Sequence, residues 1–409
     1  MNQKKIEDFI GNEEANKTIK ELGIKEWKWV KLSDYSQIIM GQSPPSETYN
    51  KDGEGLVFYQ GKTDFGNINP TPRVYCTKPT RTAKPNDILI SVRAPVGPVN
   101  IANQNCGLGR GLAALRTNRI NYKFLFYWLR FFEDKWTNAG GTTFNAIKKS
   151  NLTSLEVPLP FSDGQPDLVL QHKIVHRIEE LFSKIDYSSK LREKIEDITV
   201  EFHKASLDKI FNSIEQYSLI KVNLTNIAEL IMGQSPPSET YNKNQEGLPF
   251  YQGKTDFGDI HPTPRIYCTS SNRIAYVNDV LVSIRAPCGP VNLAIEKCGI
   301  GRGLAAIRTS KINPLYLYFW FKYYEDKWSL GGGTTFDNIR KSDFEKHNVL
   351  IPIKDDSYDN DKINEIIAFL QSIFDKKKEI MLKQSKTANL MNNLKQSILH
   401  KAFIGELVN

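Results

Sequence analysis

The sequence predicts an α+β chain in which two homologous strand-rich domains are separated by two long antiparallel coiled-coil helices, with pseudo-twofold symmetry. Three observations predict it. Nearly the whole chain consists of two copies of one sequence unit. Each copy begins with a region rich in glycine, proline and aromatic residues, and each ends in a long stretch with helical spacing of apolar residues. The length of 409 residues suffices for two or three domains, and 40% hydrophobic residues supply a core for each.

The duplication has a single offset of 192 residues. IIMGQSPPSETYNK from Ile38 returns as LIMGQSPPSETYNK from Leu230, and FYQGKTDFG from Phe58 returns from Phe250. Between residues 38 and 150 roughly two-thirds of the paired positions are identical. Since the period is this long, each copy is a full domain plus a connector, and a solenoid of short repeats is excluded.

The first part of each copy predicts a mixed, strand-rich domain. Asp87–Arg93 and Asp279–Arg285 are β-like runs bounded by turn residues. Tyr122–Trp136 has helical spacing, and Val157–Pro160 predicts a short strand.

The second part of each copy predicts a helix of about forty residues, on the order of 60 Å long. The predicted seams are Ile174, Ile178, Leu181, Ile185, Leu191, Ile195, Ile198 and Phe202 in the first copy, and Ile363, Ile367, Leu370, Phe374, Met391, Leu394 and Ile398 in the second. The first seam has one phase break near Ser188. Because such stripes need cover, we expect the two helices to pack antiparallel; the alternative is that each stripe covers its own domain.

The pattern divides the chain into five segments: an N-terminal extension (residues 1–25), a first strand-rich domain (26–163), a first spacer helix (164–216), a second strand-rich domain (217–356) and a second spacer helix with the C-terminal residues (357–409). No apolar run is long enough to span a membrane, and the N-terminus has no apolar signal region. We therefore expect a location in the cytoplasm and no membrane partner.

The sequence contains only incomplete forms of two common enzyme motifs. Gly61-Lys62-Thr63 lacks the glycine spacing and small residues of a phosphate-binding loop, and His172 and His176 flank a lysine where a zinc protease has glutamate. Five cysteines without a CxxC pair argue against a disulfide framework or zinc cluster, so they are expected to be buried or inert thiols. We expect no catalytic residue, no metal and no cofactor in this chain.

The residues retained in both copies include many flexible hydrogen-bond donors in loop-like context. They are Gln42, Gln60, Lys62, Arg73, Arg93, Arg110, Thr142, Thr143 and Lys149, and their counterparts Gln234, Gln252, Lys254, Arg265, Arg285, Arg302, Thr334, Thr335 and Lys341. Arginine pairs with guanine edges and glutamine with adenine edges, while lysine and threonine bind phosphates. With a formal charge of +8, this set predicts a DNA-binding surface, on which Gln60 and Arg110 are the leading base readers and Lys62 and Lys149 the phosphate contacts. A structural role for Arg93 and Arg285 is the alternative.

Several segments, in order, resemble the DNA-specificity (S) subunit of Type I restriction-modification enzymes. They are WKWVKLSDYSQIIMGQSP from Trp27, NDILISVRAPVGPVNI from Asn86, VPLPFSDGQPDLVLQHKIVHRIEELFSKID from Val157, KVNLTNIAELIMGQSP from Lys221 and ILHKAFIGEL from Ile398. One departure is that the family's usual Glu-Gln before the spacer helix is Leu170-Gln171 here.

The resemblance implies two target-recognition domains, each reading one half-site of double-stranded DNA, and helices whose length sets the gap. It also implies DNA adenine methyltransferase (modification) subunits that carry S-adenosylmethionine, and restriction subunits that use ATP and Mg²⁺. Most members have two dissimilar domains, whereas near-identity here predicts an interrupted palindrome as the target. The exchanges Asn67/Asp259, Asn69/His261 and Asn145/Asp337 are candidate differences in readout.

Two other classes compete with this interpretation. A single-chain restriction-methylase has a similar recognition half, but it needs methyltransferase motifs that this sequence lacks. A tandem glycan-binding protein or scaffold would instead use Tyr59, Tyr75 and Trp128 to stack on sugars.

Overall fold

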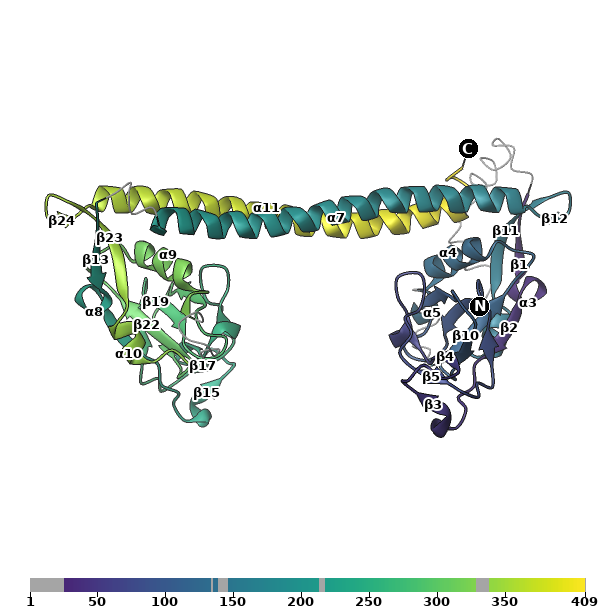
Figure 1. Cartoon of the computed structure of the whole chain (residues 1–409), viewed down its shortest axis with the longest axis horizontal. Helices are drawn as coiled ribbons and strands as arrows, with labels where there is room; N and C mark the ends of the chain where they lie inside the picture. Colours follow the sequence, from purple (N-terminus) through teal and green to yellow (C-terminus); the bar gives the residue numbers. More distant parts are fainter. Residues whose placement is uncertain (1–25, 134, 139–145, 213–217, 329–337, 409) are drawn as a thin grey trace. The chain divides into compact units, whose positions relative to one another are not determined.

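The computed structural model describes residues 26–133, 135–138, 146–212, 218–328 and 338–408, so the predicted extension 1–25 lies outside the described residues. The chain divides into unit 1 (residues 1–191 and 386–409) and unit 2 (residues 192–385). Each unit contains one strand-rich domain and one part of each long helix (Figure 1). We call residues 26–166 domain 1 and residues 219–358 domain 2.

The strands of domain 1 form three sheets with the orders β1-β11-β12, β2-β10-β7-β8 and β3-β5-β4-β9-β6. Their bounds are β1 Glu26–Lys31, β2 Gln37–Met40, β3 Tyr49–Asn50, β4 Leu56–Tyr59, β5 Tyr75–Cys76, β6 Thr82–Ala83, β7 Ile88–Ser91, β8 Val99–Ile101, β9 Cys106–Leu108, β10 Leu112–Arg116, β11 Glu156–Ser162 and β12 Gln165–Pro166. The predicted strands near Asp87–Arg93 and Val157–Pro160 are confirmed as β7 and β11.

Domain 2 repeats these three sheets strand for strand, with the orders β13-β23-β24, β14-β22-β19-β20 and β15-β17-β16-β21-β18. Their bounds are β13 Leu219–Asn223, β14 Glu229–Met232, β15 Tyr241–Asn242, β16 Leu248–Tyr251, β17 Tyr267–Cys268, β18 Ile274–Ala275, β19 Val280–Ser283, β20 Val291–Leu293, β21 Cys298–Ile300, β22 Leu304–Arg308, β23 Asn348–Lys354 and β24 Ser357–Tyr358. The prediction that the two copies share one fold is confirmed.

The helices are also repeated. The α-helices are α3 Leu32–Tyr35, α4 Tyr122–Phe132, α5 Lys135–Asn138, α6 Lys149–Thr153, α7 Leu168–Asn212, α8 Leu224–Ile227, α9 Pro314–Tyr324, α10 Lys341–Glu345 and α11 Asn360–Phe403, and short 3₁₀ turns span Ser46–Thr48, Lys62–Asp64, Ser238–Thr240 and Lys254–Asp256. In the part of the chain that the structure describes, no helix is both long and apolar enough to cross a membrane.

The four-stranded sheet of domain 1 lies between two hydrophobic clusters. Ile88 and Ile90 of β7 belong to one cluster, whereas Leu89, between them, belongs to the other. This alternation is the two-residue period of a strand whose faces are both covered. One face packs against α4 and the long helices, and the other packs against the five-stranded sheet (Figure 1).

Helix α4 begins where the Asn121 side chain accepts hydrogen bonds from the backbone N–H groups of Lys123 and Phe124. An N-terminal asparagine cap of this kind satisfies donors that the helix itself leaves unpaired. The aromatic spacing seen in the sequence buries Phe124 and Trp128 in the cluster of domain 1, so the predicted helix is confirmed from Tyr122 to Phe132. The end of the predicted stretch, at Trp136, lies in the separate short helix α5.

The two long helices are confirmed, at 45 residues for α7 and 44 for α11. Asp167 and Asp359 cap their N-termini, because each carboxylate accepts the backbone N–H of the third residue that follows it, at 2.9 Å. Within unit 1, Ser189 contacts Met391 and Asp186 contacts Lys395. The residue numbers rise along α7 as they fall along α11, so the predicted antiparallel pairing is confirmed.

The helix ends complete the domain cores. In unit 1, Ile174 and Ile178 near the start of α7 and Phe403 at the end of α11 share one cluster with α4. In unit 2, Phe211 near the end of α7 and Ile363 near the start of α11 do the same with α9. Both expectations for the stripes are therefore met in part, because each domain is covered by its own helix and by the end of the other.

The prediction of a buried seam in the second half of α7 is wrong. Leu191, Ile195, Ile198 and Phe202 are exposed, Ile198 by 62% and Phe202 by 61%, and Leu394 of α11 is exposed by 50%. The helix runs through Ser188 without interruption. Because each residue turns the helix by about 100°, the one-residue phase break rotates the later stripe away from the interhelical contact. Polar residues take its place, as where Arg192 donates to the Gln384 carbonyl oxygen.

The two copies differ in a few buried polar residues. His347 of domain 2 accepts a hydrogen bond from the Trp320 indole at 2.8 Å, whereas domain 1 has Leu155 at the matching position. Burial lowers the pKa of His347 to about 4. Burial together with Lys377 and Lys322 lowers the pKa of His203 to about 3, so both imidazoles are neutral near pH 7.

Candidate nucleic-acid interface

A cavity of about 550 Å³ opens among four loops of domain 2, which follow strands β14, β16, β19 and β21. Its lining residues are Ser235, Pro236, Ser238, Tyr241, Gln252, Gly253, Lys254, Thr255, Ser283, Arg285, Ala286, Pro287, Arg302 and Gly303. Domain 1 carries the identical residue at every matching position, from Ser43 to Gly111. We call these loops, in either domain, the four-loop site.

The loop after β4 carries Gln60 and Lys62. The buried carboxylate of Asp64 accepts hydrogen bonds from the backbone N–H of Gln60 at 2.6 Å and of Gly61 at 3.3 Å. These bonds close a tight turn that leaves the side chains of Gln60 and Lys62 exposed. The backbone is therefore held from the interior while the side chains project into solvent.

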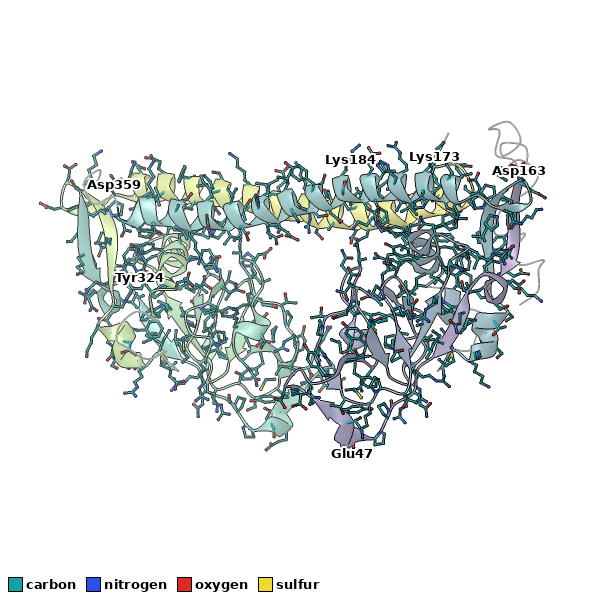
Figure 2. All side chains as sticks on the ribbon, turned by 45° about the vertical axis from the view of Figure 1, so that its right-hand side comes forward. Glu47, Asp163, Lys173, Lys184, Tyr324 and Asp359 are labelled. Atoms are coloured by element: carbon teal, nitrogen blue, oxygen red, sulfur yellow. The ribbon has the colours of Figure 1, made fainter. Side chains whose placement is uncertain are left out.

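The loop after β2 contains Ser43. Its hydroxyl accepts the backbone N–H of Arg110 at 3.2 Å, and the Tyr49 hydroxyl donates to the carbonyl oxygen of Pro44 at 2.9 Å. The Tyr49 ring stacks on Phe58 of β4. These contacts connect the loop after β2 to strand β4 and to the loop after β9. Glu47, beside this loop, lies at the end of domain 1 that is farthest from α7 (Figure 2).

The loop after β7 places Arg93. The hydroxyl of Ser91, itself buried, donates to the carbonyl oxygens of Arg93 at 3.0 Å and Pro95 at 2.9 Å. Arg93 also forms a β-bridge with Ala146. The Arg93 backbone is thus fixed, as the structural alternative expected, while its side chain stays exposed and available to a ligand.

Gly111 permits close approach of the loops after β4 and β9. A Cβ atom on Gly111 would lie 2.2 Å from the carbonyl oxygen of Gln60, whereas one on Gly61 would meet nothing within 4 Å. Only glycine at residue 111 therefore lets the loop after β9 pack directly against the Gln60 backbone.

The structure places the predicted site residues as follows. All fourteen that it describes are exposed: Gln42, Gln60, Lys62, Arg73, Arg93, Arg110, Lys149, Gln234, Gln252, Lys254, Arg265, Arg285, Arg302 and Lys341. Thr142, Thr143, Thr334 and Thr335 lie outside the described residues. The cavity of domain 2 brings together Gln252, Lys254, Arg285 and Arg302.

The other predicted residues lie beside the site or have partners of their own. Lys149 begins α6 and lies three residues after Ala146, which forms the β-bridge with Arg93. Lys341 pairs with Glu345 at 3.5 Å, and Arg73 pairs with Asp64 at 3.2 Å. Their roles in binding stay predictions.

The buried polar residues that hold these loops were not predicted from the sequence. Asp64 and Ser91 are 5% and 1% exposed, and Asn100 is 1% exposed, with its side chain bonded to both the N–H and the carbonyl of Gly66. All three recur in domain 2. The repeat therefore contained the signal, but identity alone does not separate a residue that binds a ligand from one that supports the loop.

One proposed difference in readout is a structural substitution. The Asn69 amide donates to the carbonyl oxygen of Ile101 at 2.8 Å, and the His261 imidazole contacts the matching carbonyl of Leu293, also at 2.8 Å. Both residues thus close the same turn. Asn145 and Asp337 lie outside the described residues.

The aromatic residues of the glycan-binding alternative are not available for stacking on sugars. Tyr59 is fully buried and Trp128 is 2% exposed, and both belong to domain 1 cores. Only Tyr75 is half-buried. The structure therefore contradicts Tyr59 and Trp128 as ligand platforms.

The cysteines have the character expected from the sequence. Cys76, Cys106, Cys268 and Cys298 are buried free thiols, and Cys288 is half-buried. Burial raises the pKa of Cys106 and Cys298 to about 12, so these thiols are protonated at neutral pH and poor nucleophiles. Among the described residues, no three His, Cys, Asp or Glu side chains gather where they could hold a metal ion.

Comparison with known proteins agrees with this picture. The family model "Type I restriction modification DNA specificity domain" matches residues 24–197 and 220–390. The putative type I restriction enzyme MjaX specificity subunit of Methanocaldococcus jannaschii is 44% identical over 177 residues, which are 42% of this chain and 40% of that protein. The matched segment thus spans about two-fifths of that relative's length.

Two solved structures are similar over most of their length. A chain from a study of complex assembly and conformational transition of the type I R-M system is 28% identical, with a TM-score of 0.77, over 93% of this chain and 98% of that chain. The HsdS subunit from Thermoanaerobacter tengcongensis is 27% identical, with a TM-score of 0.58, over 93% and 97%.

Proposed function

The chain belongs to the family of Type I restriction modification DNA specificity domains, and from this premise we propose that it is the non-catalytic specificity subunit of a Type I restriction-modification system. It binds double-stranded DNA through the four-loop site of each domain. The observation that carries the proposal is the clustering of Gln252, Lys254, Arg285 and Arg302 around one cavity. Amide and guanidinium groups recognise base edges, and lysine binds phosphate.

The two domains read the same bases. All fourteen residues that line the cavity in domain 2 have identical counterparts in domain 1. The two copies compared over their whole length are less similar than that. Each domain packs on the beginning of its own long helix. The two helices are antiparallel within each unit, by the contacts named above in unit 1 and by Arg192 with Gln384 and His203 with Phe374 in unit 2. Two equal readers joined to oppositely directed helices recognise an interrupted palindrome, with a gap set by helix length.

The long helices recruit the catalytic subunits. Ile198 and Phe202 on α7 are separated by 192 residues from Leu390 and Leu394 on α11, and all four are at least half exposed. Exposed apolar stripes of this kind mark protein interfaces. Because the same pair of positions recurs in both copies, the stripes suit two copies of one partner, which we identify as DNA adenine methyltransferase subunits.

The cofactors belong to those partners. S-adenosylmethionine is used by the methyltransferase subunits, and ATP and Mg²⁺ by restriction subunits where these join. The chain acts with them on the host's DNA in the cytoplasm.

Selection of duplexes from a random pool by the full chain, with its methyltransferase partner present, tests the proposal. We expect enrichment of two inverted copies of one short half-site at a fixed gap. The affinity for the selected duplex should fall steeply with salt, because each phosphate contact contributes a log–log slope of about −0.9. Enrichment of two unrelated half-sites contradicts the palindrome, and binding that is independent of salt and sequence contradicts DNA recognition itself.

A further inference from the structure

Arg73 and Arg265 are in the predicted DNA-binding set, yet each of them pairs with a buried carboxylate of its own domain. The Arg73 Nε atom is 3.2 Å from the Asp64 carboxylate, and the Arg265 Nε atom is 2.7 Å from the Asp256 carboxylate. Both carboxylates are almost fully buried, with 5% and 1% of the side chain exposed. Each arginine is thus the counter-ion of a buried acid.

The same acid holds the backbone of the leading base reader. Asp64 accepts the N–H groups of Gln60 and Gly61, and Asp256 accepts those of Gln252, at 2.6 Å, and Gly253. The chain from glutamine to aspartate to arginine is therefore repeated in both domains with the same atoms.

Further contacts tie the arginine to this turn. The Arg73 Nη1 group donates to the carbonyl oxygen of Thr63 at 3.4 Å, and in domain 2 the Arg265 Nη2 group donates to the Thr255 hydroxyl at 2.8 Å. The backbone N–H of Thr71 donates to the carbonyl oxygen of Asp64 at 2.8 Å. The segment that carries the arginine is thus folded back onto the turn that carries the glutamine.

We infer that Arg73 and Arg265 are positioning residues for base recognition, which act through the Asp64 and Asp256 carboxylates to fix the Gln60 and Gln252 turns, and do not themselves contact DNA. The inference rests on the proposed function of the four-loop site. The physical reason is that a buried carboxylate without its counter-ion is strongly destabilised, so the turn must rearrange to solvate it.

Direct phosphate binding by the same arginines is the competing role, and it has a different signature. An arginine on a phosphate contributes to affinity for every sequence and to the salt slope, about 0.9 for each contact. A positioning arginine contributes to sequence preference and leaves the slope unchanged. The salt slope and the sequence preference therefore separate the two roles.

The test compares the native full chain with the double variant Arg73→Gln/Arg265→Gln, by selection from a random duplex pool and by affinity for the native target at several salt concentrations. We expect discrimination at one base pair of each half-site to fall by roughly ten-fold, the lower end of the cost of losing a base contact, with the native salt slope retained. Lys62→Gln/Lys254→Gln is the matched control, and it should lower the slope by about 1.8 with the sequence preference unchanged.

Two further variants guard against simple unfolding. Arg73→Lys/Arg265→Lys keeps the counter-ion and should retain most of the preference. Adding Asp64→Asn/Asp256→Asn to the glutamine variant removes the buried charge, so the combined loss of preference should be smaller than the sum of the two separate losses.

The inference is overturned if the arginine-to-glutamine variant loses salt slope as the lysine control does, if it keeps the native preference, or if its loss simply adds to that of the aspartate variant. A native chain that enriches no sequence at all counts against the proposed function instead. The two failures are thus distinguishable.

Discussion

The exposed stripe on the long helices gives the most direct test of the proposed recruitment of methyltransferase subunits. We consider the quadruple variant Ile198→Ser, Phe202→Ser, Leu390→Ser and Leu394→Ser, which replaces the same two positions in both copies. These side chains are 62, 61, 66 and 50% exposed. Their removal leaves the folded chain almost unchanged, because exposed substitutions of this kind alter the free energy of unfolding by about 0.5 kcal/mol or less each.

The expected loss of affinity follows from the exposed area. About 60% of a phenylalanine side chain is on the order of 100 Å², which contributes about 2.5 kcal/mol when a partner covers it. A similar fraction of an isoleucine contributes about 1.5 kcal/mol. Loss of the Ile198 and Phe202 side chains should therefore weaken the binding of one methyltransferase subunit by about 4 kcal/mol at most. This is close to a 1,000-fold rise in its Kd.

The measurement is the Kd of a purified methyltransferase partner for this chain, by analytical ultracentrifugation or calorimetry. The pair Ile198/Phe202 and the pair Leu390/Leu394 are changed separately and then together, so that loss of one bound subunit is distinguished from loss of two. Ile220→Ser is the control, since Ile220 is 42% exposed but lies on β13 of domain 2. Unchanged Kd values in a quadruple variant with native thermal stability would refute the assignment of the stripe.

The remaining predictions concern pH, base preference and loop packing. The pKa of His347 is about 4 in the folded chain, against an ordinary value of 6.5. Between these two values the imidazole is protonated in the unfolded chain and neutral in the folded chain. Stability is therefore lost as pH falls from about 6.5 towards 4, by up to about 3 kcal/mol. His347→Leu, the residue of domain 1, should remove about 1.4 kcal/mol per pH unit from the slope of the unfolding free energy in that window, as measured by urea denaturation, and an unaltered slope contradicts the assignment. Gln60→Glu/Gln252→Glu should shift preference from adenine towards cytosine at one position of each half-site, because a carboxylate accepts from cytosine N4; selection from a random pool checks this, and retained adenine shows that another residue reads it. Gly111→Ala should lower stability by at least 2 kcal/mol because its Cβ meets the Gln60 carbonyl at 2.2 Å, whereas Gly61→Ala should change it by less than about 1 kcal/mol; equal melting temperatures for the two variants contradict the close approach.

The duplication made most of the fold accessible from the sequence. A β-like run bounded by turn residues located β7, helical aromatic spacing located α4, and helical spacing of apolar residues located α7 and α11 within a few residues. These are local signals, because each reflects the period of one element. The interhelical seam was wrong from Leu191 onwards because periodicity gives the faces of a helix but does not say which face meets a neighbour.

The candidate site was predictable in residue type and less so in role. Exposed donors such as Gln60 and Arg110 follow from a repeat of polar residues in loops. That Arg73 turns inward to Asp64, and that Ser91 and Asn100 are buried supports, depends on contacts between residues that are distant in the chain.

By itself, then, the sequence determined that the protein is a doubled domain with two long helices and matching sets of polar loop residues, because repeats, composition and periodicity are properties of the chain alone. Tertiary structure alone decided which loops meet around one cavity, which arginine faces a buried acid and which helical stripe is left for a partner. The physical reason is that burial and ion pairing depend on what packs against a residue, and packing is settled only when distant segments come together.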